Sequence, residues 1–201
     1  DDVYCAGNDE VFTFLENVLS EVMGLFPSEY IHIGGDEAHK TQWKASDEIQ
    51  QMIRDLGLKD EAELQAWFTR QIDAYLTEHG RKLVGWDEIL EGGLAPGAVV
   101  MSWRGEKGGV TAAQAGHDVI MAPTSHTYFD YRQQADELGL GRSVVTLEKV
   151  YSFDPVPESL DAEQAQHPRG RAGHALPNPV GVGPHLGRGR GLVLVAAVSL
   201  D

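Results

Sequence analysis

Four short apolar segments, each followed directly by polar and aromatic residues, constrain the fold of this 201-residue chain most strongly. They cover 30–34, 82–86, 98–103 and 118–122. Short apolar strands separated by helical patterns are typical of a parallel sheet that is covered on both faces. The carboxyl ends of parallel strands share one edge, where barrel enzymes place their active sites. The sequence therefore predicts an α/β protein with a polar and aromatic site at that edge.

Helical periodicity fills the stretches between these segments. Apolar residues recur at spacings of three and four, as on the buried face of a helix. Asn8 and Ser46 stand where a helix cap is expected. The expected helices cover roughly Asp9–Leu25, Asp47–Leu56, the stretch from a capping box at Asp60 and Glu63 to Gly80, and Val110–Ala115. A closed barrel needs eight strands and about 250 residues. The sequence therefore predicts an incomplete (β/α)8 TIM barrel.

Composition narrows the classes of partner. The formal net charge of −15 argues against nucleic acid as a partner. No apolar run is long enough to span a bilayer. The start of the chain lacks the features of a secretory signal, and Cys5 is the single cysteine, so we expect no internal disulfide. Neither the compartment nor the oligomeric state follows from these observations.

The composition changes abruptly near residue 166. No Asp or Glu occurs from Gln164 to Leu200, whereas Gly, Pro and Arg are frequent there. Such a segment buries too little apolar surface to order itself. We therefore predict a folded region over 1–166 and an aberrant or disordered tail over 167–201.

Two adjacent acids, Asp36 and Glu37, follow two glycines at the end of the first apolar segment. Neighbouring side chains on a strand point to opposite faces, so both acids share a pocket only where the strand breaks into a loop. Gly34 and Gly35 permit that break. The pattern predicts a paired-carboxylate site, although a solvated loop pair is an alternative. A metal site that adds His32 and His39 matches no standard zinc spacing.

A second acid pair, Asp87 and Glu88, follows the second apolar segment. These residues imitate the first pair, but we favour ion-pair or helix-start roles for them. Taken alone, Trp86 and Trp103 are better interpreted as plain core residues than as parts of a binding site. His126 is interpreted as structural rather than catalytic.

Four motifs in order give the chain a specific resemblance. They are His32-Ile33-Gly34-Gly35-Asp36-Glu37, Gly85-Trp86-Asp87-Glu88-Ile89, Met101-Ser102-Trp103-Arg104-Gly105 and Tyr128-Phe129-Asp130-Tyr131. Together they resemble the catalytic domain of the β-N-acetylhexosaminidases, glycoside hydrolase family 20, over roughly residues 3–166. The resemblance implies the middle to late strands of that family's barrel.

The resemblance also implies residue roles. Glu37 would be the general acid and then the general base, and Asp36 would orient and polarise the 2-acetamido group of the substrate. Tyr128 would donate a hydrogen bond to the acetamido oxygen as that oxygen attacks. The implied substrate-binding residues are Trp86 and Trp103, which would wall the pocket, and Asp130, which would bind a sugar hydroxyl. No metal or organic cofactor is implied.

The implied function is removal of terminal, non-reducing β-linked N-acetylhexosamine from glycans with retention of configuration. Ordinary glycosidases hold two carboxylates about 5–9.5 Å apart across the scissile bond, which adjacent residues do not easily achieve. A substrate-assisted reaction is therefore expected. Two alternatives remain: a related chitinase-like glycosidase, and an inactive fragment that at most binds sugar, because the family's sugar-gripping Arg and closing strand have no match in the chain.

Overall fold

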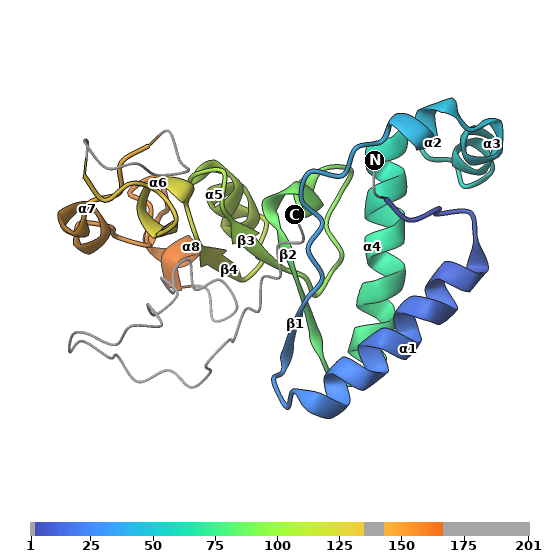
Figure 1. Ribbon diagram of the computed structural model, residues 1–201, viewed down its shortest axis with the longest axis horizontal. Helices are drawn as coiled ribbons and strands as arrows, with labels where there is room; N and C mark the ends of the chain where they lie inside the picture. The colour runs from blue at the N-terminus through green and yellow to red at the C-terminus, as the bar shows by residue number, and fades with distance from the viewer. Residues whose placement is uncertain (1–2, 135–142, 167–201) are drawn as a thin grey trace.

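The computed structural model describes residues 3–134 and 143–166 (Figure 1). Its centre is a parallel sheet of β1 (Tyr30–His32), β2 (Lys82–Trp86), β3 (Val99–Ser102) and β4 (Val119–Met121). The strands stand in the sheet in the order in which they occur in the chain. This arrangement confirms the predicted α/β class and the incomplete barrel, with four strands in the described residues. The predicted tail, 167–201, lies outside them.

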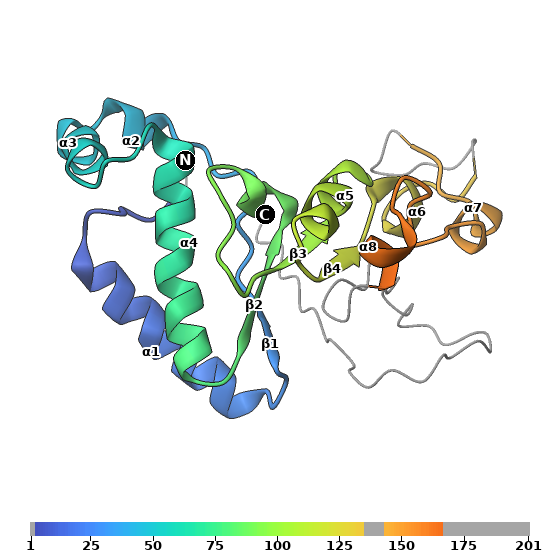
Figure 2. The same ribbon diagram turned by 180° about the vertical axis from the view of Figure 1, so that it is seen from behind.

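Helices cover one face of this sheet. The long helices α1 (Asp9–Leu25) and α4 (Glu61–Glu78) lie on the same side of β1 and β2, and α5 (Lys107–Gln114) packs against β3 and β4 (Figure 1). Figure 2 shows the same arrangement from behind, with α6 (Thr124–Thr127), α7 (Leu147–Tyr151) and α8 (Ala162–Gln166) grouped beyond β4. The other short helical elements are α2 (Thr41–Ala45), α3 (Asp47–Asp55) and η1 (Asp87–Leu90).

The expected helix caps are present. Asn8 Oδ1 accepts a hydrogen bond from the Glu10 N–H, and this side-chain bond satisfies one free donor at the start of α1. At the start of α4, Asp60 Oδ1 accepts from the Glu63 N–H. The predicted capping box is shifted by one residue, because Glu63 accepts from the Lys59 N–H rather than from that of Asp60.

The two faces of the sheet bury different residues. Leu83 packs with Ile72 and Leu76 of α4, on the helix-covered face. Its neighbour Val84 packs with Met101 on the opposite face. This alternation places His32 and Trp86 on that opposite face, at the carboxyl end of the sheet.

Helix α5 begins earlier than the sequence indicated. Its expected start was Val110, but it begins at Lys107 and includes Gly108 and Gly109. Glycines in a helix usually weaken it, which is why the prediction excluded them. Here they permit close packing, since a Cβ at Gly109 would lie 2.4 Å from the sulfur of Met121. The packing gained by this close approach of α5 to the sheet offsets the low helix propensity of the two glycines.

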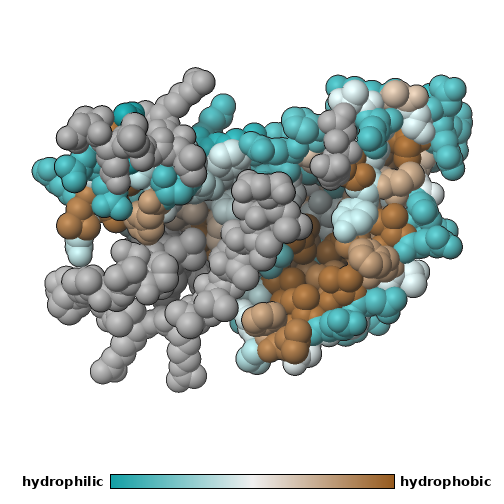
Figure 3. Space-filling model, in the orientation of Figure 1, coloured by the Kyte–Doolittle hydropathy of each residue, from teal (hydrophilic) through white to brown (hydrophobic). Residues whose placement is uncertain are grey.

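An apolar hollow separates α1 from β1. Figure 3 shows apolar side chains gathered there, and the cavity, of about 710 Å³, is lined by Leu15, Leu19 and Phe68 among others. No residue of α1 is fully buried, although the predicted apolar face does turn toward the core. Within 3–134 and 143–166, no helix is long and apolar enough to cross a membrane.

Candidate active site

The chain leaves β1 through a turn with unusual backbone angles. Gly34 and Gly35 have φ values of 79° and 97°, and Glu37 has φ 46°. Glu37 is the sole non-glycine residue with positive φ in the described part of the chain. L-residues seldom adopt this conformation, and those that do cluster at functional sites. The turn confirms the expected break in the strand, and it leaves both Asp36 and Glu37 exposed.

Two side chains bind the backbone of this turn. His32 Nδ1 accepts a hydrogen bond from the Gly34 N–H at 3.0 Å, and Gln65 of α4 donates to the Gly35 carbonyl at 2.9 Å. The Trp86 N–H also donates to the Gly34 carbonyl, which ties the turn to β2. The turn is therefore fixed through its backbone, and its two carboxylates are left without a hydrogen bond or ion pair among the described residues.

An aromatic row follows the carboxyl ends of the strands. The His32 and Trp86 rings lie 4.9 Å apart, the Trp86 and Trp103 rings 6.4 Å, and the Trp103 and Tyr128 rings 6.4 Å with nearly parallel planes. These residues follow or end four different strands. The parallel sheet thus gathers residues that are almost one hundred positions apart in sequence into one wall, as the strand-end pattern predicted.

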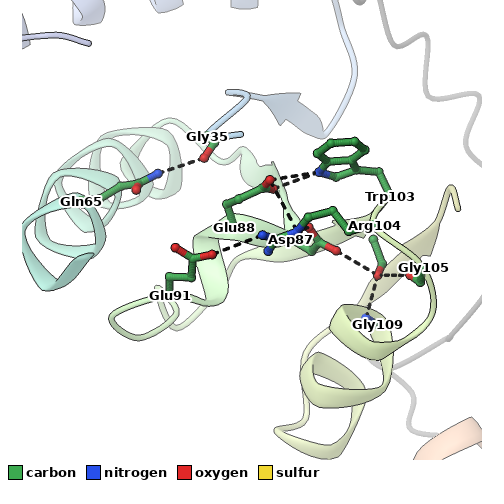
Figure 4. Close-up of polar contacts among 10 residues, drawn as sticks. Gly35, Gln65, Asp87, Glu88, Glu91, Trp103, Arg104, Gly105 and Gly109 are labelled. Carbon is green, nitrogen blue, oxygen red and sulfur yellow. Dashed lines mark hydrogen bonds and ion pairs between the residues drawn. The ribbon is translucent and has the colours of Figure 1, made fainter. Parts of the chain in front are cut away.

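The second acid pair is embedded in a polar network (Figure 4). Asp87 and Glu88 begin η1 and are both buried. Asp87 accepts from Arg104 Nε at 2.7 Å, and Glu88 accepts from the Trp103 indole N–H at 3.0 and 3.3 Å. Arg104 also reaches Glu91. These contacts confirm the predicted ion-pair and helix-start roles.

Burial shifts the pKa of two groups in the row. Loss of solvent lowers the pKa of His32 to about 4, partly opposed by the negative charge of Asp36. Burial raises the pKa of the Tyr128 phenol to about 12, and the nearby charges of Asp36 and Asp130 add to that rise. His32 is therefore neutral at pH 7, and Tyr128 keeps its proton and remains a hydrogen-bond donor.

Most predicted site residues meet at this edge. Trp86, Trp103 and Tyr128 form the wall, and Asp36 lies near enough to Tyr128 to influence its ionisation. Glu37 lines the apolar cavity and also a smaller one, of about 320 Å³, which it shares with Trp103. Asp130 lies on an exposed turn beside Tyr128, with no hydrogen bond or ion pair to a described residue.

Sequence reasoning missed three supporting residues, His32, Gln65 and Arg104. Their partners come from other elements or from the backbone of a turn, so no local pattern indicates them. His32 is a partial exception, because a histidine two residues before Gly34 is close enough in sequence to bind the turn. His126 stacks on Phe153 at 5.1 Å, which is consistent with a structural role. The described residues contain no group of three or more His, Cys, Asp or Glu side chains arranged to hold a metal ion.

Comparison with known proteins identifies relatives of the chain. The sequence model of the glycosyl hydrolase family 20 catalytic domain matches residues 1–175. A β-hexosaminidase of Porphyromonas gingivalis is 51% identical over 170 residues, which are 83% of this chain and 22% of the relative. A β-hexosaminidase of Vibrio furnissii is 36% identical over 73% of this chain and 25% of the relative. The chain thus spans about a quarter or less of the length of these two relatives.

Solved structures agree with the sequence relatives. The exo-β-N-acetylglucosaminidase of Vibrio harveyi, solved in complex with N-acetylglucosamine, superposes with a TM-score of 0.70 at 32% identity. The match covers 79% of this chain and 26% of that one. A β-N-acetylhexosaminidase structure superposes with a TM-score of 0.72 at 27% identity, over 82% of this chain and 36% of the other.

Proposed function

The chain belongs to glycosyl hydrolase family 20, and on that premise we propose that it forms part of an enzyme that removes terminal, non-reducing β-linked N-acetylhexosamine from glycans. The arrangement of side chains at the carboxyl end of the sheet carries the proposal. There, the acid pair on the turn after β1 lies near a wall of two indoles and one phenol: Asp36 influences the ionisation of Tyr128, and Glu37 lines a cavity with Trp103. Family membership argues against the chitinase-like alternative.

The proposed reaction begins with the substrate's own acetamido group. The acetamido oxygen attacks the anomeric carbon while the bond to the leaving oxygen breaks, and Glu37 donates a proton to that leaving oxygen. This attack forms a cyclic oxazolinium ion. Asp36 accepts a hydrogen bond from the N–H of the acetamido group and offsets the positive charge of that ion. Water then attacks the anomeric carbon while the bond between that carbon and the acetamido oxygen breaks, which restores the acetamido group, and Glu37 removes a proton from the water. Two inversions retain the configuration.

The remaining predicted residues bind the sugar in this proposal. Tyr128 donates a hydrogen bond to the acetamido oxygen, and its raised pKa supports that role because the phenol stays protonated at neutral pH. Trp86 and Trp103 enclose the acetamido group and the sugar ring, and Asp130 binds a sugar hydroxyl. The reaction needs no metal or organic cofactor, since the substrate supplies the nucleophile. The proposal keeps the division between a partial barrel over 1–166 and a tail over 167–201.

Turnover of 4-nitrophenyl N-acetyl-β-glucosaminide by the 201-residue chain tests this function. The matched control substrate is the corresponding glucoside, which lacks the acetamido nucleophile. Hydrolysis of the first and not of the second is the expected result. No hydrolysis of either would favour the inactive-fragment alternative, which the four described strands of an eight-strand fold motivate. A covalent bond between sugar and protein, detected by mass spectrometry, would rule out the substrate-assisted route.

A further inference from the structure

The main contact of the Glu88 carboxylate is not with Arg104. Arg104 Nε lies 2.7 Å from Asp87 but 3.5 Å from Glu88, and Arg104 Nη1 is directed to Glu91. The nearest partner of the Glu88 carboxylate is instead the Trp103 indole N–H, at 3.0 Å. Figure 4 shows the Glu88 side chain directed at that indole from η1.

The contact joins a fixed carboxylate to a residue of the aromatic row. Glu88 is only 7% exposed, and its backbone carbonyl accepts the bond from the Glu91 N–H that closes the η1 turn. A buried carboxylate that accepts an N–H bond is held more firmly than a surface one, because less water competes for the bond. The indole it holds stacks on Tyr128 and lines the same cavity as Glu37.

We propose that Glu88 is a positioning residue that fixes the orientation of the Trp103 indole, and thereby the wall against which the substrate packs. The second part rests on the proposed function, since it requires that Trp103 contact the sugar. An indole without this bond would be free to rotate about its side-chain torsions, which would widen the pocket and loosen its stacking on Tyr128. Glu88 itself touches no reacting atom.

Two substitutions at this position separate the hydrogen bond from the charge. Glu88→Gln keeps an oxygen that accepts from the indole N–H but removes the charge. Glu88→Leu keeps a similar volume and removes the acceptor. Circular dichroism and thermal melts establish that each variant folds. If Glu88 served only in ion pairing, both variants would alter the Trp103 indole to the same extent. If Glu88 positions Trp103, Gln at position 88 should keep the indole in place and Leu should not.

Hydrogen exchange of the indole N–H protons measures directly how well the bond between Trp103 and Glu88 is maintained. The chain has four tryptophans, and the Trp103 signal is assigned by its loss in Trp103→Phe. Trp43, whose indole donates to the Tyr4 carbonyl at 3.0 Å, serves as an internal control. We expect the Trp103 indole proton to exchange roughly tenfold faster in Glu88→Leu, as for loss of a hydrogen bond to a charged group, with little change in Glu88→Gln. Equal exchange in all three proteins would overturn the proposal.

Sugar affinity tests the second part of the proposal. We expect Glu88→Leu to weaken binding of N-acetylglucosamine several-fold, and to have little further effect in a Trp103→Phe background, because a double-mutant cycle reveals residues that act through one another. Additive effects would show that Glu88 acts on the sugar by another route. If the chain neither binds nor hydrolyses the sugar, the proposed function fails, yet the exchange measurement still decides whether Glu88 positions Trp103.

Discussion

An Asp-Glu pair follows each of the strands β1 and β2, and the fold places the two pairs in opposite environments. Asp36 and Glu37 stand exposed on a turn with positive φ. Asp87 and Glu88 lie buried at the start of a 3-10 helix and are bound to Arg104 and Trp103. A pair whose bonds are already made is suited to holding structure, and a pair without protein partners is free to bind a substrate. This contrast favours a catalytic role for the first pair and a structural role for the second.

The largest expected difference between the pairs is in turnover. In a full-length hexosaminidase that contains this sequence, we expect Glu37→Gln to lower kcat by about 10²–10⁴-fold, which is the usual contribution of a general acid. Glu88→Gln should cost less than about tenfold, since the amide still accepts from Trp103. Steady-state kinetics with good and poor leaving groups measure both. Similar losses for Glu37→Gln with every leaving group would remove Glu37 from the acid role.

The region of the first pair should also show a distinctive response to acid. The pKa of His32 falls from 6.5 to about 4 on folding, so between these pH values the unfolded chain binds a proton that the folded chain does not. The free energy of unfolding should therefore fall as pH drops through this window, by about 3 kcal/mol in all. His32→Phe should flatten that part of the profile in urea melts at each pH. Parallel profiles for the two proteins would contradict the assignment.

Stability should distinguish the two aspartates. Asp87→Ala removes a buried acceptor from Arg104 and should lower the free energy of unfolding by about 2 kcal/mol. The loss is moderate because the Arg104 side chain is 44% exposed and can bind water instead. Asp36→Ala should change stability by less than about 0.5 kcal/mol, as expected for an exposed side chain. Urea denaturation at pH 7 measures the free energy of unfolding of both variants. Equal losses in the two would contradict the different roles of Asp36 and Asp87.

The smallest effect concerns the backbone alone. At position 37, Gly should be more stable than Ala by about 1 kcal/mol, because φ is 46° there. At position 88, within a 3-10 helix, Ala should be the more stable of the two. Thermal melts of the four variants give both differences. If Ala were also the more stable of the two at position 37, the turn after β1 would store no strain.

Much of the fold was predictable because it depends on local signals. The bounds of β2 and α1 and the cap at Asn8 were predicted correctly, since periodicity, capping and strand-ending residues all lie within a few positions. The start of α5 was wrong because Gly108 and Gly109 serve contacts with distant elements. Local propensity carries no information on such contacts.

The site was predictable to the extent that strand ends reveal it. The pattern after each apolar segment indicated Trp86, Trp103 and Tyr128, and the structure brings these three together. The roles of Gln65 and Arg104 were not predictable, because they depend on hydrogen bonds between residues 13 or more positions apart. The ion-pair and helix-start roles of the second acid pair were predicted only as a preference, since both pairs follow similar strands.

The order of the strands in the sheet has a consequence for folding during synthesis. β1 to β4 stand side by side in the order in which they leave the ribosome, so each new strand finds its partner already present. Chains fold from the N-terminal end during synthesis, and nearby partners shorten the search. We expect nascent chains arrested after β2, β3 and β4 to gain protease resistance stepwise. Resistance that appears only once β4 has emerged would indicate that the sheet assembles all at once.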